Sequence, residues 1–129
     1  MTYKYKSPLA PKKINNIKAI AGVDLYTFSA GLYKKHRSDI ALFIFNEPGS
    51  IAEVFTKSSI KSHTLNWNKK NLKSRVVKAI FINAGNANTF TGHQGVKSIT
   101  DLAKKISTQY DVPVNKFFLC STGVIGEPY

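Results

Sequence analysis

The hydrophobic pattern of residues 75–121 constrains the fold more than any other feature of the sequence, because its period changes twice. Residues 75–83, RVVKAIFIN, form an apolar, β-branched run that is typical of a buried strand. From Gly95 to Tyr110, apolar residues recur at three- and four-residue steps, which indicates one apolar face of a helix. Residues 116–121, KFFLCS, then favour another strand. This order predicts a βαβ unit, and therefore a sheet with a helical layer on at least one face.

Three more strands are predicted upstream of this unit. Residues 17–32 are rich in β-branched and aromatic residues and have no helical stripe, which favours a strand. Residues 40–46, IALFIFN, form a continuous apolar run of strand length, as expected for a strand buried on both faces. Residues 50–56 also favour a strand, so 40–56 is predicted to form a hairpin around Pro48–Gly49.

The polar residues 58–74 are expected to contain a short helix near 63–72, with Ser62 or Thr64 as its N-cap. Residues 1–15 contain two prolines and several lysines, which predicts an extended, solvated segment at the amino terminus.

The size of the chain and its single cysteine limit the classes of protein to consider. A chain of 129 residues, 43% hydrophobic, can form one domain with a core but not two. No apolar run approaches the ~18 residues that span a bilayer, and no apolar core of a signal peptide follows the basic amino terminus. Cys120 is the only cysteine, which fits a reducing compartment. We therefore expect a soluble, cytoplasmic protein.

The formal net charge of +12 raises the question of an anionic partner. Only Arg37 and Arg75 are arginines, and the lysines are scattered along the chain. No RNP-like, zinc-finger or helix-turn-helix pattern accompanies them. A lysine-rich solvated surface is the favoured interpretation, with no nucleic-acid partner. The alternative is a small basic α/β module that binds an anion or a nucleic acid.

The loop from Ile82 to Gly95, INAGNANTFTGHQG, separates the predicted strand from the predicted helix. A loop in this position presents backbone N–H groups at a helix N-terminus, where anions are stabilised. Its glycines permit positive φ, and its asparagines can bond to the backbone; these residues are Asn83, Gly85, Asn86, Asn88, Gly92 and Gly95. The loop matches neither the Walker A nor the G-x-G-x-x-G pattern. Two interpretations stay open, an Asn-stapled turn without a ligand or an anion site.

A second short loop, STGVIGEP at residues 121–128, follows the last predicted strand. Thr122 and Gly123 could present a hydroxyl or an N–H group to developing negative charge, as an oxyanion hole does.

A nucleophile and a base are also conceivable within the chain. Cys120 and Ser121 are candidate nucleophiles, and His36, His63 and His93 are candidate bases. Cys120 ends an apolar strand, so a buried and inert thiol is expected. The three histidines lie far apart in the sequence, so no metal site is predicted.

Several ordered segments resemble the glutamate N-acetyltransferase family, the ornithine acetyltransferases of arginine biosynthesis. FINAGNANTFTGHQG, followed by a helix, is similar to the family's N-S-G-N-A-N-A-C-T-G segment, and STGVIG occurs at the family's separation. Within RSDIALFIFNEPGSIAEVFTKSSIK, the stretch VFT also matches in order, as does the VP turn before the last strand. The resemblance covers the chain from about Ile20 onward.

This resemblance implies an α/β fold whose mixed sheet and helical layer are part of a four-layer αββα sandwich. It also implies an N-acetyltransferase whose precursor cleaves itself before a threonine. That threonine, at the start of the β chain, carries acetyl from N-acetylornithine to glutamate. No cofactor is implied, although some members use acetyl-CoA as a substrate. An α2β2 heterotetramer is implied as the assembly.

Site residues follow from the same resemblance. Thr122 and Gly123 match the family's oxyanion-hole residues, and the loop is expected to support them through Asn83, Gly85, Asn86, Asn88 and Gly92. Ala84 and Thr89–Phe90 depart from the family's Ser and Ala-Cys. The nucleophilic threonine has no counterpart here. Residues 1–129 are therefore expected to form one incomplete domain, the amino-terminal portion of the α chain, and to be inactive alone.

Overall fold

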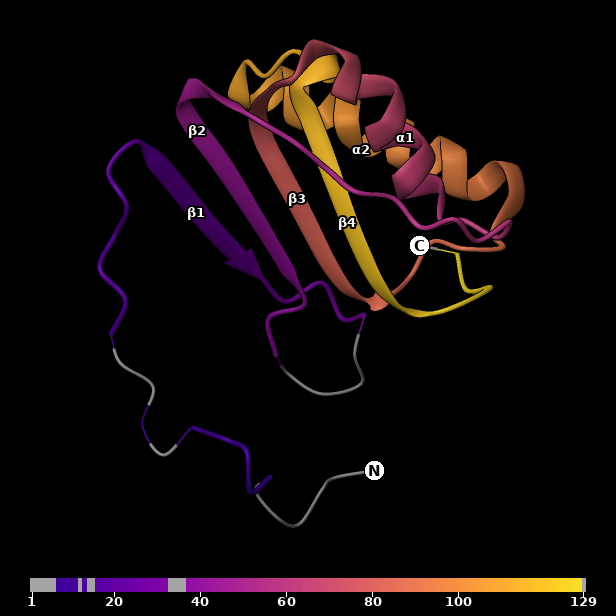
Figure 1. Ribbon diagram of the computed structural model, residues 1–129, viewed down its shortest axis with the longest axis horizontal. Coiled ribbons are helices and arrows are strands. Elements are labelled where there is room, and N and C mark those ends of the chain that lie inside the picture. The colour runs from indigo at the N-terminus through magenta and orange to yellow at the C-terminus, as the bar shows by residue number, and fades with distance from the viewer. Residues whose placement is uncertain (1–6, 12, 14–15, 33–36, 129) are drawn as a thin grey trace.

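The computed structural model describes residues 7–11, 13, 16–32 and 37–128. Within these residues, a four-stranded sheet with the order β1-β2-β3-β4 carries two α-helices on one face (Figure 1). The elements are β1 (Val23–Phe28), β2 (Ile40–Ser50), α1 (His63–Asn71), η1 (Leu72–Ser74), β3 (Val76–Asn86), α2 (Gly92–Tyr110), η2 (Val114–Lys116) and β4 (Phe117–Val124). The first three strands are antiparallel, and β4 is parallel to β3. The predicted α/β class with a mixed sheet is confirmed.

The predicted βαβ unit is present as β3, α2 and β4, but its strands are longer than expected. β3 continues to Asn86 and β4 to Val124, past the predicted ends at residues 83 and 121. α2 ends where Asp111 adopts a left-handed conformation, just before Pro113. The Asn/Gly loop therefore begins inside the sheet, and its first residues pair with β4.

The core lies between the sheet and the two helices. Side chains alternate in direction along a strand, so every second residue of β2, β3 and β4 faces the helices. The buried cluster on this side consists of Leu42, Ile44, Ala79, Phe81, Ile99, Ala103, Val112, Phe117 and Leu119. Ile99 and Ala103 come from the predicted apolar face of α2, whereas Val96, predicted for the same face, is 49% exposed.

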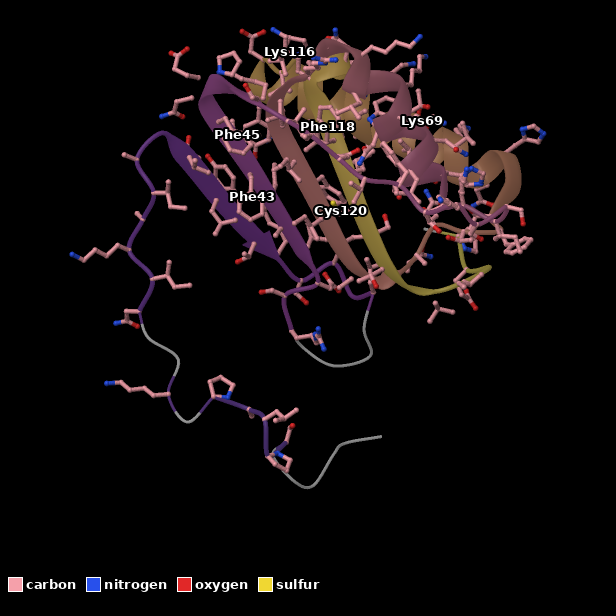
Figure 2. The ribbon with its side chains drawn as sticks, viewed as in Figure 1. Phe43, Phe45, Lys69, Lys116, Phe118 and Cys120 are labelled. Atoms are coloured by element: carbon pink, nitrogen blue, oxygen red, sulfur yellow. The ribbon has the colours of Figure 1, made fainter. Side chains whose placement is uncertain are left out.

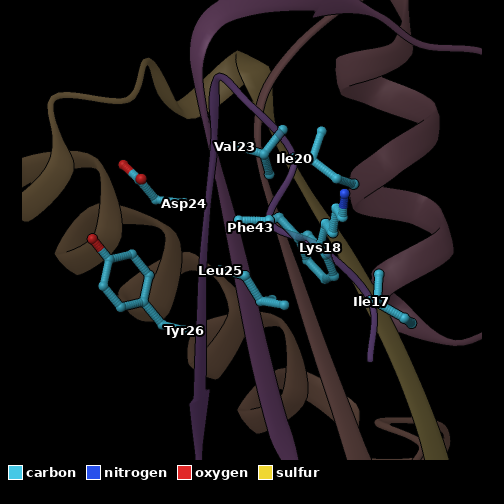
Figure 3. A pocket seen from close by; sticks show the side chains of 9 residues that line it. Ile17, Lys18, Ile20, Val23, Asp24, Leu25, Tyr26 and Phe43 are labelled. Atoms are coloured by element: carbon cyan, nitrogen blue, oxygen red, sulfur yellow. The ribbon is translucent and has the colours of Figure 1, made fainter. Parts of the chain in front are cut away.

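The opposite face of the sheet is also apolar, but no helix of the described chain lies on it (Figure 1). Strand alternation and pairing place these residues there: Val23, Leu25, Ala41, Phe43, Phe45, Ile80, Ile82, Phe118 and Cys120. Leu25 is 56% exposed, whereas Phe118, toward the other edge of this face, is only 1% exposed. In Figure 3, Ile17 and Ile20 lie beside Leu25 and Phe43 on this side, whereas Asp24 and Tyr26 point to the other. We call this surface the open face.

The predicted hairpin around Pro48–Gly49 is wrong. β2 runs through both residues to Ser50, and the segment 51–56 forms no strand. Ile44 pairs with Ala79 while Gly49 pairs with Val77, so residues 45–48 bulge opposite a single residue of β3. A bulge accommodates a proline, which has no N–H group to donate to a ladder.

Other predictions are confirmed in part. α1 lies where expected, and the Ser62 hydroxyl accepts its capping bond from the Thr64 N–H at 3.3 Å. The strand predicted for 17–32 is confined to β1. Burial along β2 alternates, so this strand is not buried on both faces. Of the predicted segment 1–15, only residues 7–11 and 13 are among the described residues.

No helix in the described part of the chain combines the length and the apolar character needed to cross a membrane.

Candidate functional site

The two loops singled out in the sequence meet at the carboxyl ends of β3 and β4. Because these strands are parallel and adjacent, Asn83 pairs with Ser121, Ala84 with Thr122 and Gly85 with Gly123. In parallel sheets whose strands are joined by helices, binding residues commonly lie at the carboxyl ends of the strands. Thr122 and Gly123 are exposed there.

Gly123 occupies a position that only glycine fits. Its φ is +136°, outside the range of L side chains. A Cβ atom built there would lie 2.2 Å from the carbonyl carbon of Gly85 and 2.5 Å from the backbone nitrogen of Asn86. Gly85 also has a positive φ, +122°, and its own Cβ would meet Leu32 at 2.9 Å. The two backbones therefore approach each other through a pair of glycines.

Side-chain amides hold this part of the site together. The Ser121 hydroxyl donates to Asn83 Oδ1 at 2.6 Å, and Asn83 Nδ2 donates to the Asn86 carbonyl at 2.8 Å. Asn86 Nδ2 donates in turn to the Glu127 carbonyl, and Asn86 Oδ1 accepts from the Asn88 N–H at 2.7 Å. Asn83 and Asn86 are buried. The chain of bonds links both ends of the 121–127 loop to β3.

Asn88 extends this network to the helix that follows. Its side chain is fully buried, accepts from the Thr91 hydroxyl at 2.6 Å and donates to the Gly95 carbonyl at 3.2 Å. The Ser62 hydroxyl, at the start of α1, donates to the Ala87 carbonyl at 2.8 Å. The loop is therefore fixed to the first turns of both helices. Gly92, the first residue of α2, has a φ of +56° and no close neighbour.

The edge of β4 that faces away from β3 is covered by side chains of α1. Asn68 accepts from the Leu119 N–H and donates to the Leu119 carbonyl, both at 2.9 Å. Trp67 Nε1 and Asn71 Nδ2 donate to the Phe117 carbonyl at 2.9 and 3.1 Å. Backbone groups alternate in direction along a strand, so the N–H of Gly123 is expected on the same edge as that of Leu119.

A crevice of about 340 Å³ runs along this edge. Its walls are the segment around Glu53, the first turns of α1 around Thr64, and β4 from Leu119 to Ser121. Glu53 Oε1 accepts from Asn68 Nδ2 at 2.8 Å. Among the described residues, the buried Oε2 of Glu53 has no hydrogen-bond partner. Loss of hydration raises the pKa of the Glu53 carboxyl, and the bond from Asn68 opposes that shift.

Cys120 is exposed, not buried as its place in an apolar run predicts, because it lies on the open face. Partial burial and the nearby Glu53 charge raise the pKa of its thiol. A raised pKa keeps the thiol protonated, which disfavours nucleophilic attack. His63 lies in a groove between α1 and α2, and neither it nor the exposed His93 lines the crevice. His36 lies outside the described residues.

No group of three or more His, Cys, Asp or Glu side chains suited to a metal ion occurs among the residues that the structure describes.

Three residues that shape this region, namely Asp39, Asn68 and Glu53, were not predicted from the sequence. Asp39 is 3% exposed, and its carboxylate accepts from the N–H groups of Ala30 and Leu32, both at 2.7 Å. This places Leu32 against Gly85. Asn68 and Glu53 lie in segments whose pattern carries no signal of edge pairing. Of the three, only Asp39 had a sequence feature that could have indicated its role, because it is an acidic residue next to a predicted turn in a basic chain.

Comparison with known proteins gives one consistent result. Residues 24–129 match the ArgJ family. The chain is 44% identical over 123 residues to the arginine biosynthesis bifunctional protein ArgJ of Agrobacterium fabrum, covering 95% of this chain and 30% of that protein. It is 42% identical to the protein of the same name from Bradyrhizobium diazoefficiens, with the same coverage. The chain thus spans about 30% of the length of these relatives.

Solved structures agree with this. The crystal structure of the ArgJ protein from Bacillus halodurans has the same fold, with a TM-score of 0.79 at 24% identity, over 84% of this chain and 57% of that one. Ornithine acetyltransferase from Mycobacterium tuberculosis, solved in complex with ornithine, matches with a TM-score of 0.74 at 25% identity, over 84% of this chain and 59% of that one.

Proposed function

Because the chain belongs to the ArgJ family, we propose that it is the amino-terminal part of the α chain of a glutamate N-acetyltransferase. The enzyme transfers acetyl from N-acetylornithine to glutamate in arginine biosynthesis. The ornithine complex of the M. tuberculosis relative supports this substrate class. Acetyl-CoA, which some members of the family use, is a candidate second acetyl donor, and the proposed site of action is the cytoplasm.

In this proposal, Thr122 and Gly123 form the oxyanion hole. The hydroxyl of a threonine outside these 129 residues attacks the acetyl carbonyl, and the negative charge that develops on the carbonyl oxygen needs fixed donors. Collapse releases ornithine, and the α-amino group of glutamate then takes the acetyl group from the threonine. The observation that carries the assignment is the exposed turn held by the Gly85–Gly123 contact, with Thr122 beside it.

The open face supports the proposed four-layer αββα sandwich. An apolar sheet face of this size needs to be covered, and sheets pack face to face about 10 Å apart. A second sheet from the remainder of the precursor, including the β chain, is the proposed cover. The α2β2 heterotetramer is the proposed assembly.

The test is expression of the full gene product, followed by mass spectrometry and an assay of acetyl transfer from N-acetylornithine to glutamate. Two chains are expected, the second beginning with threonine, and Thr122→Ala is expected to lower kcat by about 10²- to 10³-fold. Isolated residues 1–129 should transfer no acetyl. A single uncleaved chain, or full activity in Thr122→Ala, would refute the assignment.

The proposed supporting role of the loop residues has its own test. Asn86→Ala removes the bonds to Glu127 and Asn88, so slower self-cleavage and a lower kcat are expected in the full gene product. Asn66→Ala, an exposed asparagine of α1, is the matched control. If Asn86→Ala left cleavage and turnover unchanged, Asn86 would have no part in positioning the 121–127 loop.

A further inference from the structure

A buried carboxylate lies close to the carboxyl ends of β3 and β4, and the proposed function gives it no role. Asp39, the residue before β2, is 3% exposed, and its carboxylate accepts from the N–H groups of Ala30 and Leu32, both at 2.7 Å. A buried carboxylate is costly unless hydrogen bonds compensate it, and bonds to a charged acceptor are about twice as strong as neutral ones. Asp39 therefore fixes the segment 30–32, which belongs to no helix or strand.

The backbone of Asp39 ties the same segment to β3. Its N–H donates to the carbonyl of Phe28, the last residue of β1, at 3.0 Å, and its carbonyl accepts from the Ala84 N–H at 2.8 Å. Ala84 pairs in turn with Thr122 of β4. Asp39 thus joins the end of β1, the segment 30–32 and the part of β3 that lies beside Thr122.

Leu32 lies against the pair of glycines at this end of the sheet. A Cβ atom built on Gly85 would lie 2.9 Å from the Leu32 Cβ and 3.1 Å from the Leu32 carbonyl oxygen, so Leu32 is in contact with the Gly85 backbone. The Gly85 carbonyl oxygen lies 2.4 Å from the position that a Cβ atom of Gly123 would take. Gly85 therefore contacts both Leu32 and Gly123, and groups packed this closely pass a displacement on to their neighbours.

We propose that Asp39 is a positioning residue for the oxyanion hole. Its side chain holds Leu32 against Gly85, and this contact fixes the backbone of Thr122 and Gly123; the inference rests on the function proposed above for those two residues. Asp39 acts through Leu32 and does not itself bind the acetyl group. Donors that stabilise a developing oxyanion have to be fixed before the reaction, and a displacement of about 1 Å can lower a rate about 10²-fold.

Asp39→Asn in the full gene product tests this role. Asparagine keeps the size of the side chain and one carbonyl oxygen, but its NH₂ group cannot accept a bond from the second backbone N–H. We expect kcat, counted per chain that forms acetyl-enzyme, to fall about tenfold and KM for N-acetylornithine to stay within about twofold, because the substrate contacts are unchanged. Asp111→Asn is the matched control, since Asp111 is exposed after α2 and its left-handed backbone also suits asparagine. An unchanged kcat in Asp39→Asn, or an equal fall in Asp111→Asn, would overturn the proposal.

Leu32→Gly tests the route from Asp39 to the glycines. It removes the Cβ atom that faces Gly85 and keeps the N–H that donates to Asp39. Leu32→Gly alone should lower kcat about as much as Asp39→Asn, and adding Asp39→Asn should lower it by less than about twofold more, because residues that act through one contact are not additive. Full multiplication of the two effects would contradict the route. If Asp39→Asn does not fold, Leu32→Gly alone decides, and an unchanged kcat in that variant would overturn the proposal.

Amide hydrogen exchange of the 121–127 loop separates this inference from the proposed function. Exchange in this loop of the full gene product should be about tenfold faster in Asp39→Asn than in Asp111→Asn, because the loop is held less firmly. Full activity in Thr122→Ala together with this faster exchange would refute the proposed function and leave Asp39 as the residue that positions the loop. Equal exchange in the two aspartate variants would overturn the inference whatever the activity.

Discussion

At the scale of residues, hydrogen bonds from side-chain amides hold the chain together beyond the ends of β3 and β4, where backbone pairing between the strands stops. Asn83, Asn86 and Asn88 are buried and hydrogen-bonded. Buried amides are costly to leave unpaired, so each one restricts the loop to a single arrangement. This rigidity suits a site whose donors have to be aimed before the substrate arrives.

Gly123→Ala should abolish acetyl transfer in the full gene product, because a Cβ atom would collide with the Gly85 backbone as well as strain φ. Gly126→Ala is a matched control, since Gly126 also has a positive φ, +85°, but nothing lies within 4 Å of its Cβ position. Strain alone costs about 1–2 kcal/mol in the control. Kinetics and thermal denaturation of both variants measure the difference, and similar losses in the two would rule out the contact as the cause.

Glu53→Gln should change how stability depends on pH. The folded-state pKa of Glu53 is raised above its ordinary value of 4.5, so its stabilising contribution is present below pH 4.5 and is lost as pH rises through the raised pKa. The variant should therefore gain stability relative to the parent chain as pH rises. Urea denaturation from pH 4.5 upward measures this, with the exposed Glu47→Gln as the control. A constant difference across pH would show that the Glu53 pKa is not raised.

At the scale of elements, α1 does more than cover the core. An unpaired strand edge is a template for association with other chains. α1 closes part of the β4 edge, because Asn68 imitates a neighbouring strand by bonding both backbone groups of Leu119. Lys69 (labelled in Figure 2) and Lys70 lie in the last turn of α1, where their positive charges interact favourably with the helix dipole.

Asn68→Leu should destabilise the fold by about 2–3 kcal/mol, because the N–H and the carbonyl of Leu119 would both lose buried partners. Asn66→Leu, two residues earlier on an exposed position of the same helix, is expected to change stability by less than about 0.5 kcal/mol. Chemical denaturation compares the two variants. If Asn68→Leu and Asn66→Leu were equally stable, water would be able to satisfy the Leu119 backbone groups in place of Asn68 without loss of stability.

At the scale of the whole molecule, one sheet face is packed against two helices, and among the described residues the other face, the open face, carries no helix. Figure 2 shows Phe43 and Phe45 of β2 and Phe118 and Cys120 of β4 on the sheet. Strand alternation assigns all four to the open face, where Cys120 is exposed but Phe118 is buried. Apolar patches of this extent mark surfaces that bind another layer or another chain.

Isolated residues 1–129 are therefore expected to self-associate as concentration rises, and co-expression with the remainder of the gene product is expected to suppress this. Sedimentation velocity measures the association. Phe43→Lys, on the open face, should reduce it, whereas Thr100→Lys, on the helical side, should not. A chain that stays monomeric at all concentrations would show that the open face needs no cover.

Much of the helical layer and the sheet was predictable, because hydrophobic period is a local property. The period of 75–83 and 95–110 predicts β3 and α2, and the order of elements predicts the parallel pairing with β4. The 40–56 hairpin failed for a reason that is not local. Pro48–Gly49 is a turn signal in isolation, but pairing of Gly49 and Ser50 with β3 keeps the strand extended past it.

The sequence by itself determined the family, the βαβ unit and the two loops, since these rest on motifs and on the spacing of apolar residues. Only the tertiary structure decided that Gly85 and Gly123 touch, that Asp39 and Asn68 support their surroundings, and that Cys120 lies on an open face. Contacts between residues distant in sequence depend on strand register and on how elements pack. A pattern along one chain segment carries no information about either.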